Sequence, residues 1–185
     1  YDAYSHKVGS KECEEGQCDV LHIYGNRRRF FMYNTSYQAA SAVITGSEKY
    51  PDIRGLAVFV PTELGTMVSV SVYGLPKSEG ECRCGVFAMH IHEGMTCTGN
   101  AEDPFADVKG HYNPNGCLHP CHKGDMPPLF ADNGTAYFAF ITTRFTSEDV
   151  IGHTIIIHRN FDDLHTQPSG NSGEKIACGE IMPIL

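Results

Sequence analysis

Residues 53–75 read IRGLAVFVPTELGTMVSVSVYGL, and this stretch decides the fold. It contains two runs, 53–62 and 65–75, in which β-branched and aromatic residues alternate with small or polar ones. Such alternation is typical of strands with one buried face. The connector Glu63-Leu64-Gly65 is short enough for a tight hairpin. The stretch therefore predicts two consecutive strands joined by a hairpin.

The strand pattern continues on both sides of this hairpin. Five further runs share it: ASAVITG (40–46), GVFAMHIHE (85–93), TAYFAFITTRF (135–145), HTIIIH (153–158) and KIACGEIMPI (175–184). Only TSEDV (146–150) opens like a helical turn, with a threonine followed by acidic residues. About eight short strands with almost no helix indicate an all-β fold, an eight-stranded Greek-key β-barrel or sandwich.

Two segments between the runs, about 93–134 and 159–174, are too long for simple hairpins. Long irregular loops inside a compact domain usually carry function or are disordered. The first loop holds most of the candidate ligands described below, which favours function.

Residues 1–38 differ from the rest of the chain and lack a continuous strand pattern. They contain the cysteine pair Cys13 and Cys18 and the basic run 27–29. We expect an N-terminal extension, a disulfide-pinned segment or hairpin, before a main domain over 39–185. A polyanion-binding patch built on the three arginines is the alternative.

Composition excludes some classes of function. The formal net charge of −8 argues against a general nucleic-acid binder. The sequence contains no run of about 18 apolar residues, so it predicts no membrane-spanning helix. The first residues lack the pattern of a signal peptide, so we expect that a leader was removed or lies before this sequence. Eight cysteines are typical of a disulfide-bonded protein in an extracytoplasmic location (secreted, cell-surface or periplasmic), although metal ligation is the competing use of cysteine.

Histidines stand at regular spacings in the strand runs and in the first long loop. His90 and His92 face the same side if they lie in a strand, because side chains alternate there. His158 ends another run, and His111 stands in the loop motif GHYNP. Four imidazoles without a thiolate suit Cu(II). We therefore predict copper ligands at His90, His92, His111 and His158.

The segment HPCHKGD (119–125) supplies a second set of ligands. Three imidazoles and one carboxylate suit a closed tetrahedral zinc site. The predicted zinc ligands are His111, His119, His122 and Asp125. If His111 gives one ring nitrogen to each metal, the two sites share an imidazolate bridge. Rival motifs are absent, since the sequence has no HExxH of zincins and no PCxxC of zinc deaminases.

The order HIHEG, GHYNP, HPCHKGD, His158 and ACG resembles that of the copper/zinc superoxide dismutase family. The resemblance covers roughly residues 39–185, and the phrases CTGNAEDPF and DDLHTQPSGNSGEKIACG are similar to the bacterial branch. It implies a Greek-key barrel with a zinc loop and an electrostatic loop over copper, and it assigns the same two ligand sets.

The resemblance also implies roles for residues outside the ligand sets. Asp162 would accept hydrogen bonds from the far ring nitrogens of His90 and His119. Cys97 and Cys178 would form a disulfide. Additional pairs, Cys13 with Cys18 and Cys117 with Cys121, are expected locally, whereas Cys82 and Cys84 have no evident partner.

Lys175 marks a departure from the family, whose active-site arginine usually lies three residues before the final cysteine. A lysine keeps the positive charge but loses the planar fork of arginine. Ser169 is a weaker match to a threonine that narrows the channel. Lys109 and Lys123 are either rim charges or ordinary surface residues.

The implied activity converts two superoxide ions and two protons into dioxygen and hydrogen peroxide. Copper changes its oxidation state in this reaction, since zinc has no redox chemistry. His111 would carry a proton and Lys175 would attract the anion, which makes them the predicted catalytic residues. A non-enzymatic copper- and zinc-binding protein for metal delivery or buffering is the alternative, and a structural β-sandwich is a more remote one. A homodimer and a monomer both remain open.

Overall fold

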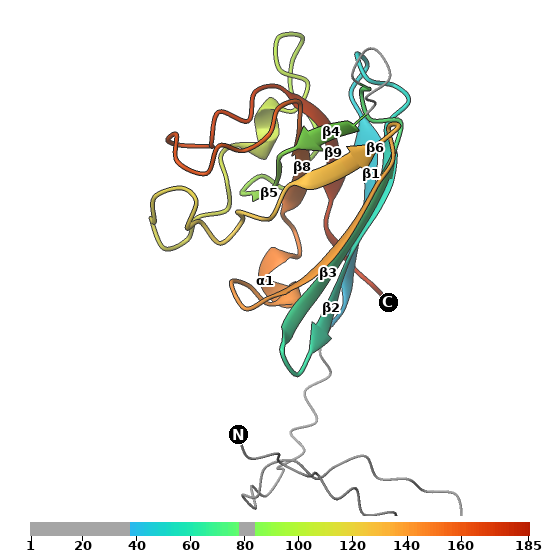
Figure 1. Ribbon diagram of the computed structural model, residues 1–185. Coiled ribbons are helices and arrows are strands. Elements are labelled where there is room, and N and C mark those ends of the chain that lie inside the picture. Colours follow the sequence, from blue (N-terminus) through green and yellow to red (C-terminus); the bar gives the residue numbers. More distant parts are fainter. Residues whose placement is uncertain (1–37, 78–83) are drawn as a thin grey trace, which may run out of the picture. The chain divides into compact units, whose positions relative to one another are not determined.

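The computed structural model describes residues 38–77 and 84–185, which belong to one compact unit, Ser36–Leu185 (Figure 1). The predictions for residues 1–37, including the pair Cys13 and Cys18, and for Cys82 lie outside the described residues. Among those that are described, no helix is long and apolar enough to cross a membrane.

Strands dominate this part of the chain. They are β1 (Ala40–Gly46), β2 (Arg54–Thr62), β3 (Gly65–Tyr73), β4 (Cys84–Phe87), β5 (Met89–His92), β6 (Leu129–Asp132), β7 (Ala136–Thr142), β8 (Thr154–His158), β9 (Lys175–Glu180) and β10 (Met182–Pro183). The helical elements are one 3-10 turn, η1 (Ala106–Val108), and one short helix, α1 (Ser147–Val150). Thr146 and Asp149 form a capping box at the start of α1, which confirms the predicted helical turn.

The main sheet has the strand order β5-β8-β9-β1-β2-β3-β7, and β10 pairs with β1. Strands β4 and β6 form a separate antiparallel pair. Because β1 lies between β2 and β9, the chain crosses over between distant segments, as in Greek-key folds. The sheet curls around its apolar face (Figure 1), and the predicted all-β Greek-key fold is confirmed.

The hairpin over residues 53–75 forms as predicted. Strands β2 and β3 pair from Arg54↔Tyr73 to Thr62↔Gly65. On β3, the side chains of Val68, Val70 and Val72 are fully buried, and the residues between them are partly exposed. The alternation in the sequence therefore places one face of this hairpin in the core.

The strands differ from the predicted runs in three main places. The run 175–184 divides at Ile181 into β9 and β10. The run 85–93 breaks at Ala88, whose N–H donates to the Asn160 oxygen (2.8 Å) and whose oxygen accepts from His158 N–H (2.9 Å). At this residue the chain changes partners, from β6 to β8. Strand β6 lies in a segment that was predicted to be loop, because its short apolar run follows two prolines and precedes a turn.

Two long connections approach the same side of the sheet (Figure 1). The metal loop runs from β5 to β6, over residues 93–128, and the capping loop runs from β8 to β9, over residues 159–174. A disulfide joins Cys97 in the metal loop to Cys178 in β9, with the Cα atoms 5.7 Å apart. Closing a loop of 81 residues stabilises a fold by about 4–5 kcal/mol in the chain-entropy model.

Candidate metal centre

Four buried imidazoles meet where β5 lies beside β8. His90 pairs in register with Ile156, and His92 pairs with Thr154. His111 reaches the same place through an isolated bridge to His92, and His158 ends β8. We call these residues the four-histidine group: His90, His92, His111 and His158.

Backbone carbonyls fix the tautomers of two of these rings. Nδ1 of His92 donates to the Lys109 oxygen (2.8 Å), and Nδ1 of His158 donates to the Gly173 oxygen (3.3 Å). Carbonyl oxygens only accept, so the protons lie on Nδ1 and both Nε2 atoms keep their lone pairs. These two Nε2 atoms lie 3.3 Å apart. Two lone pairs so close together favour a cation between them.

Burial keeps three of these rings neutral. It lowers the pKa of His92 well below its ordinary value and the pKa of His158 to about 3. It also lowers the pKa of His90, although the hydrogen bond to Asp162 opposes this effect. Neutral imidazoles are the form that binds metals, so these three rings are ready for a metal at neutral pH.

The second group has three imidazoles and a carboxylate. Nδ1 of His111 lies 2.7 Å from Asp125 Oδ1, and Nδ1 of His122 lies 3.4 Å from the same oxygen. Nδ1 of His119 lies 3.1 Å from Asp125 Oδ2. Burial acts to raise the pKa of Asp125, but the contacts with His111, His122 and His119 together outweigh it and lower that pKa. We call these residues the aspartate-containing group: His111, His119, His122 and Asp125.

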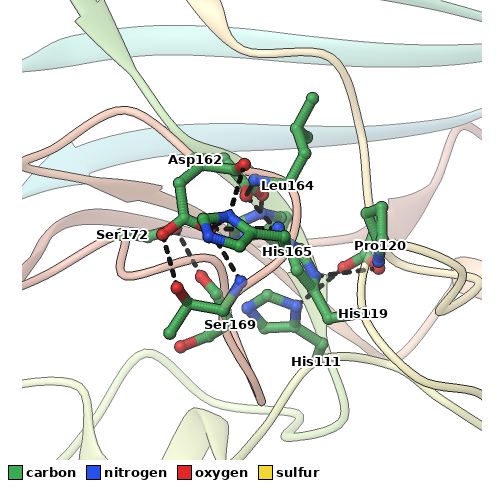
Figure 2. Close-up of polar contacts among 12 residues, drawn as sticks. His111, His119, Pro120, Asp162, Leu164, His165, Ser169 and Ser172 are labelled. Atoms are coloured by element: carbon green, nitrogen blue, oxygen red, sulfur yellow. Dashed lines mark hydrogen bonds and ion pairs between the residues drawn. The ribbon is translucent and has the colours of Figure 1, made fainter.

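Asp162 joins the two groups from the capping loop. Its Oδ2 accepts from His90 Nε2 (2.7 Å), and its Oδ1 accepts from His119 Nε2 (2.8 Å) and from the Leu164 N–H (2.8 Å). Figure 2 shows Asp162 beside His119 and Leu164, with His111 on the other side of His119. Burial acts to raise the pKa of Asp162, but these hydrogen bonds hold it well below its usual range. The carboxylate therefore orients one ring in each group.

Three buried ring nitrogens have no hydrogen-bond partner: His90 Nδ1, His111 Nε2 and His119 Nδ1. An unsatisfied buried polar atom is costly, and native proteins rarely leave three together. The Asp162 contacts require protons on the far nitrogens of His90 and His119, so their Nδ1 atoms carry lone pairs. In each group the possible ligand atoms lie within 4.8 Å of one another. The donors thus fit two metal ions.

The loops that hold the second group are themselves clamped. Gln167 binds the backbone of His119 twice, accepting from its N–H (3.0 Å) and donating to its oxygen (2.7 Å). The Arg144 guanidinium donates to the oxygens of Pro120, His122 and Asp125 at 2.9–3.4 Å. The sequence reading missed both residues, since no local motif marks them.

The capping loop approaches Asp162 closely at Gly170. This residue has φ of +65°, and a Cβ there would lie 1.8 Å from Asp162 Oδ1. Beside it, Ser172 Oγ donates to the Ser169 oxygen (2.6 Å), which folds the loop back on itself (Figure 2). A glycine is therefore required for the loop to cover the site.

A cavity of about 410 Å³ opens onto the four-histidine group. Its lining includes four histidines and three charged residues: His92, His111, His122, His158, Glu93, Lys109 and Lys175. Ser169 also lines it, at the place where a channel residue was expected. Lys123 does not, and its ammonium lies 3.4 Å from Asp149. Of the two lysines considered as rim charges, only Lys109 lies at this cavity.

The cysteines correct one expectation. Cys97 and Cys178 are bonded as the resemblance implied, but Cys117 and Cys121 are free thiols, as is Cys84. The Asn113 side chain holds Cys117 through both its N–H and its oxygen (2.9 Å each). This clamp orders the turn without a second disulfide.

Comparisons with known proteins agree with this geometry. The sequence model of the copper/zinc superoxide dismutase family (SODC) matches residues 53–181. The Cu-Zn superoxide dismutase of Deinococcus radiodurans is 32% identical over 151 residues, which cover 71% of this chain and 79% of that protein. A second such enzyme, from Aquifex aeolicus, is 30% identical, covering 70% of this chain and 80% of that protein.

Solved structures give the same fold. The Cu/Zn superoxide dismutase of Brucella abortus superposes with a TM-score of 0.65 at 22% identity, covering 77% of this chain and 98% of that one. The match of the family model covers most of the described domain, and the two relatives named above come from bacteria. The chain therefore belongs to the copper/zinc superoxide dismutase family, in its bacterial-type branch.

Proposed function

We propose that the protein disproportionates superoxide, with copper held by His90, His92, His111 and His158 and zinc held by His111, His119, His122 and Asp125. The observation that carries this proposal is the orientation of His111. Its Nδ1 faces the Asp125 carboxylate, and its Nε2 has no hydrogen-bond partner and belongs to the four-histidine group. One imidazole thus serves both groups, as a bridge between two metals requires.

Copper, when held by the four-histidine group, would supply one-electron redox chemistry, which zinc lacks. The protein supplies position and protons. Nε2 of His111 would hold a proton in one half of the cycle and donate it to the reduced substrate, because Nδ1 faces the aspartate-containing group and leaves Nε2 free for this role. Overall, two superoxide ions and two protons give one dioxygen and one hydrogen peroxide.

Lys175 is the residue that we propose attracts the anion. It lines the cavity, it is the register partner of His158, and its side chain is 18% exposed. A cation at the end of a cleft can raise the local concentration of an anionic substrate. Such focusing matters here, since the whole chain carries a formal charge of −8.

The alternative is a non-enzymatic metal-binding protein, used in metal delivery or buffering. One observation favours it: the ammonium of Lys175 is paired with the carboxylate of Asp103, which offsets the charge that would attract the anion. Pulse radiolysis separates the two functions when copper- and zinc-loaded protein is compared with protein loaded with zinc alone. Rapid superoxide decay that requires copper supports the enzyme. No decay at full copper occupancy rejects the enzyme and leaves the metal-binding function.

We also propose an extracytoplasmic location and a homodimer. The Cys97–Cys178 disulfide is typical of oxidising compartments. Phe130 and Tyr137, on β6 and β7, are 68% and 69% exposed, and apolar side chains of this size are common in subunit interfaces. Sedimentation of the full chain tests the dimer, and a mass of 20.4 kDa at all concentrations would reject it.

A further inference from the structure

The strongest unexplained contact near the cavity is the ion pair between Lys175 and Asp103. Lys175 lines the cavity, but Asp103 is not part of its lining. The carboxylate therefore draws the ammonium toward the side of the cavity. Any anion that approaches the four-histidine group meets a lysine whose charge is already offset.

Asp103 is fixed in place through its second carboxylate oxygen and its backbone. Oδ1 accepts from the Phe105 N–H (3.1 Å), and the Asp103 N–H donates to Asn100 Oδ1 (2.9 Å). The Asp103 oxygen accepts from the N–H groups of Asn100 (2.9 Å) and Ala106 (3.1 Å). The carboxylate is thus held in a tight turn, and it does not depend on Lys175 for its position.

The turn is tied to the strand that carries Lys175. Phe105 is buried in a small cluster with Val108, Ile156 and Cys178. Cys178 lies in β9, three residues after Lys175, and its disulfide to Cys97 anchors the start of the same loop. The carboxylate and the ammonium are therefore held on two segments that are joined covalently and by packing.

We propose that Asp103 is a positioning residue that draws the Lys175 ammonium aside and offsets its charge, and so lowers the affinity of the cavity for small anions. This inference rests on the proposed function, since it concerns the anion that approaches the proposed copper site. The pair is partly exposed, with 41% of the Asp103 side chain accessible, so solvent screens part of the effect. Without the carboxylate, the ammonium turns into the cavity that it already lines.

The test uses Asp103→Asn, because asparagine can still accept from the Phe105 N–H and so preserves the turn. Glu102→Gln is the matched control, since it removes one charge from an exposed neighbour in the same loop. Azide is the probe, titrated against full-length protein loaded with copper and zinc and followed by its charge-transfer absorbance. We expect azide to bind about 3- to 10-fold more tightly to Asp103→Asn, and less than 2-fold more tightly to Glu102→Gln.

A double-mutant cycle identifies Lys175 as the group through which Asp103 acts. In a Lys175→Gln background, Asp103→Asn should tighten azide binding no more than Glu102→Gln does. Asp103→Glu restores a carboxylate and should bind azide within about 2-fold of the parent protein. An unchanged or weakened azide affinity in Asp103→Asn overturns the inference, as does an equal gain in the Lys175→Gln background.

A second readout does not depend on copper or on activity. Acylation of Lys175 by an amine-reactive reagent, followed by peptide mass spectrometry on the metal-free full chain, reports how far the ammonium is withdrawn. Asp103→Asn should raise the labelling rate of Lys175 about 3-fold or more, and Glu102→Gln should not. If azide binds no variant, the proposed copper site fails, but this readout still decides the inference, since equal labelling in all variants overturns it.

Discussion

Replacement of Asp162 by alanine should weaken both metal sites, and zinc more than copper. The carboxylate orients His90 in one group and His119 in the other, through hydrogen bonds of 2.7 and 2.8 Å. Loss of such a contact typically reduces metal affinity about 10- to 100-fold, or roughly 1.4 to 2.7 kcal/mol. The two histidines differ in what else holds them, so the losses of affinity at the two metal sites should fall at opposite ends of this range.

His90 lies within β5, where the ladder to β8 fixes its backbone. His119 lies in the metal loop, outside any regular strand, and its ring is held on the far side only by Asp162. Without Asp162 the His119 ring loses the hydrogen bond that orients its far side, whereas the strand still directs the His90 ring toward its partners. We therefore expect zinc affinity to fall about 100-fold and copper affinity about 10-fold.

Competition with a chromophoric chelator measures both affinities on the full chain, with zinc and Cu(II) titrated separately. Circular dichroism first establishes that the variant is folded. Asp52→Ala is the control, since it removes a carboxylate from an exposed turn between β1 and β2, and it should change neither affinity by more than about 2-fold. An equal loss of affinity for both metals, or a greater loss of copper affinity than of zinc affinity, would refute the argument that the strand holds His90 in place.

Two further predictions concern the clamp and the buried rings. Gln167→Ala removes two hydrogen bonds from the backbone of His119. We expect zinc affinity to fall about 10-fold and copper affinity to stay unchanged in the same chelator competition. An equal fall in copper affinity would contradict the proposed role of Gln167 as a clamp on the zinc ligand. Burial lowers the pKa of His158 to about 3 in the folded metal-free chain. Below pH of about 6.5, this histidine is therefore protonated in the unfolded chain but stays neutral in the folded chain. The free energy of unfolding should therefore decrease as the pH falls, by about 2 kcal/mol at pH of about 5 from this residue alone, in urea titrations. The decrease should be smaller in His158→Gln, and an identical decrease in both proteins would show that another group is responsible.

The sequence predicts most of the fold and the two ligand groups because both depend on short periodic patterns. Alternation in β3 predicts one buried face, and the spacing of His90 and His92 places both rings on one side of β5. Strand β6 was not predicted, because it has only four residues, which follow two prolines and precede a turn, and so short a run shows too little periodicity. Its partner β4 is also short, so the pair depends on packing more than on local preference.

The contacts that tune the site were the least predictable, because they join residues that are far apart in sequence and lie in irregular loops. Gln167 reaches His119 across 48 positions, and Lys175 reaches Asp103 across 72. Neither pair follows a helical or strand period, so no spacing in the sequence signals it. In the sequence alone, Lys175 is a free cation that replaces the arginine of the family. In the folded chain its charge is offset by Asp103, which means that the attraction of the cavity for an anion is a property of the pair and not of the lysine alone.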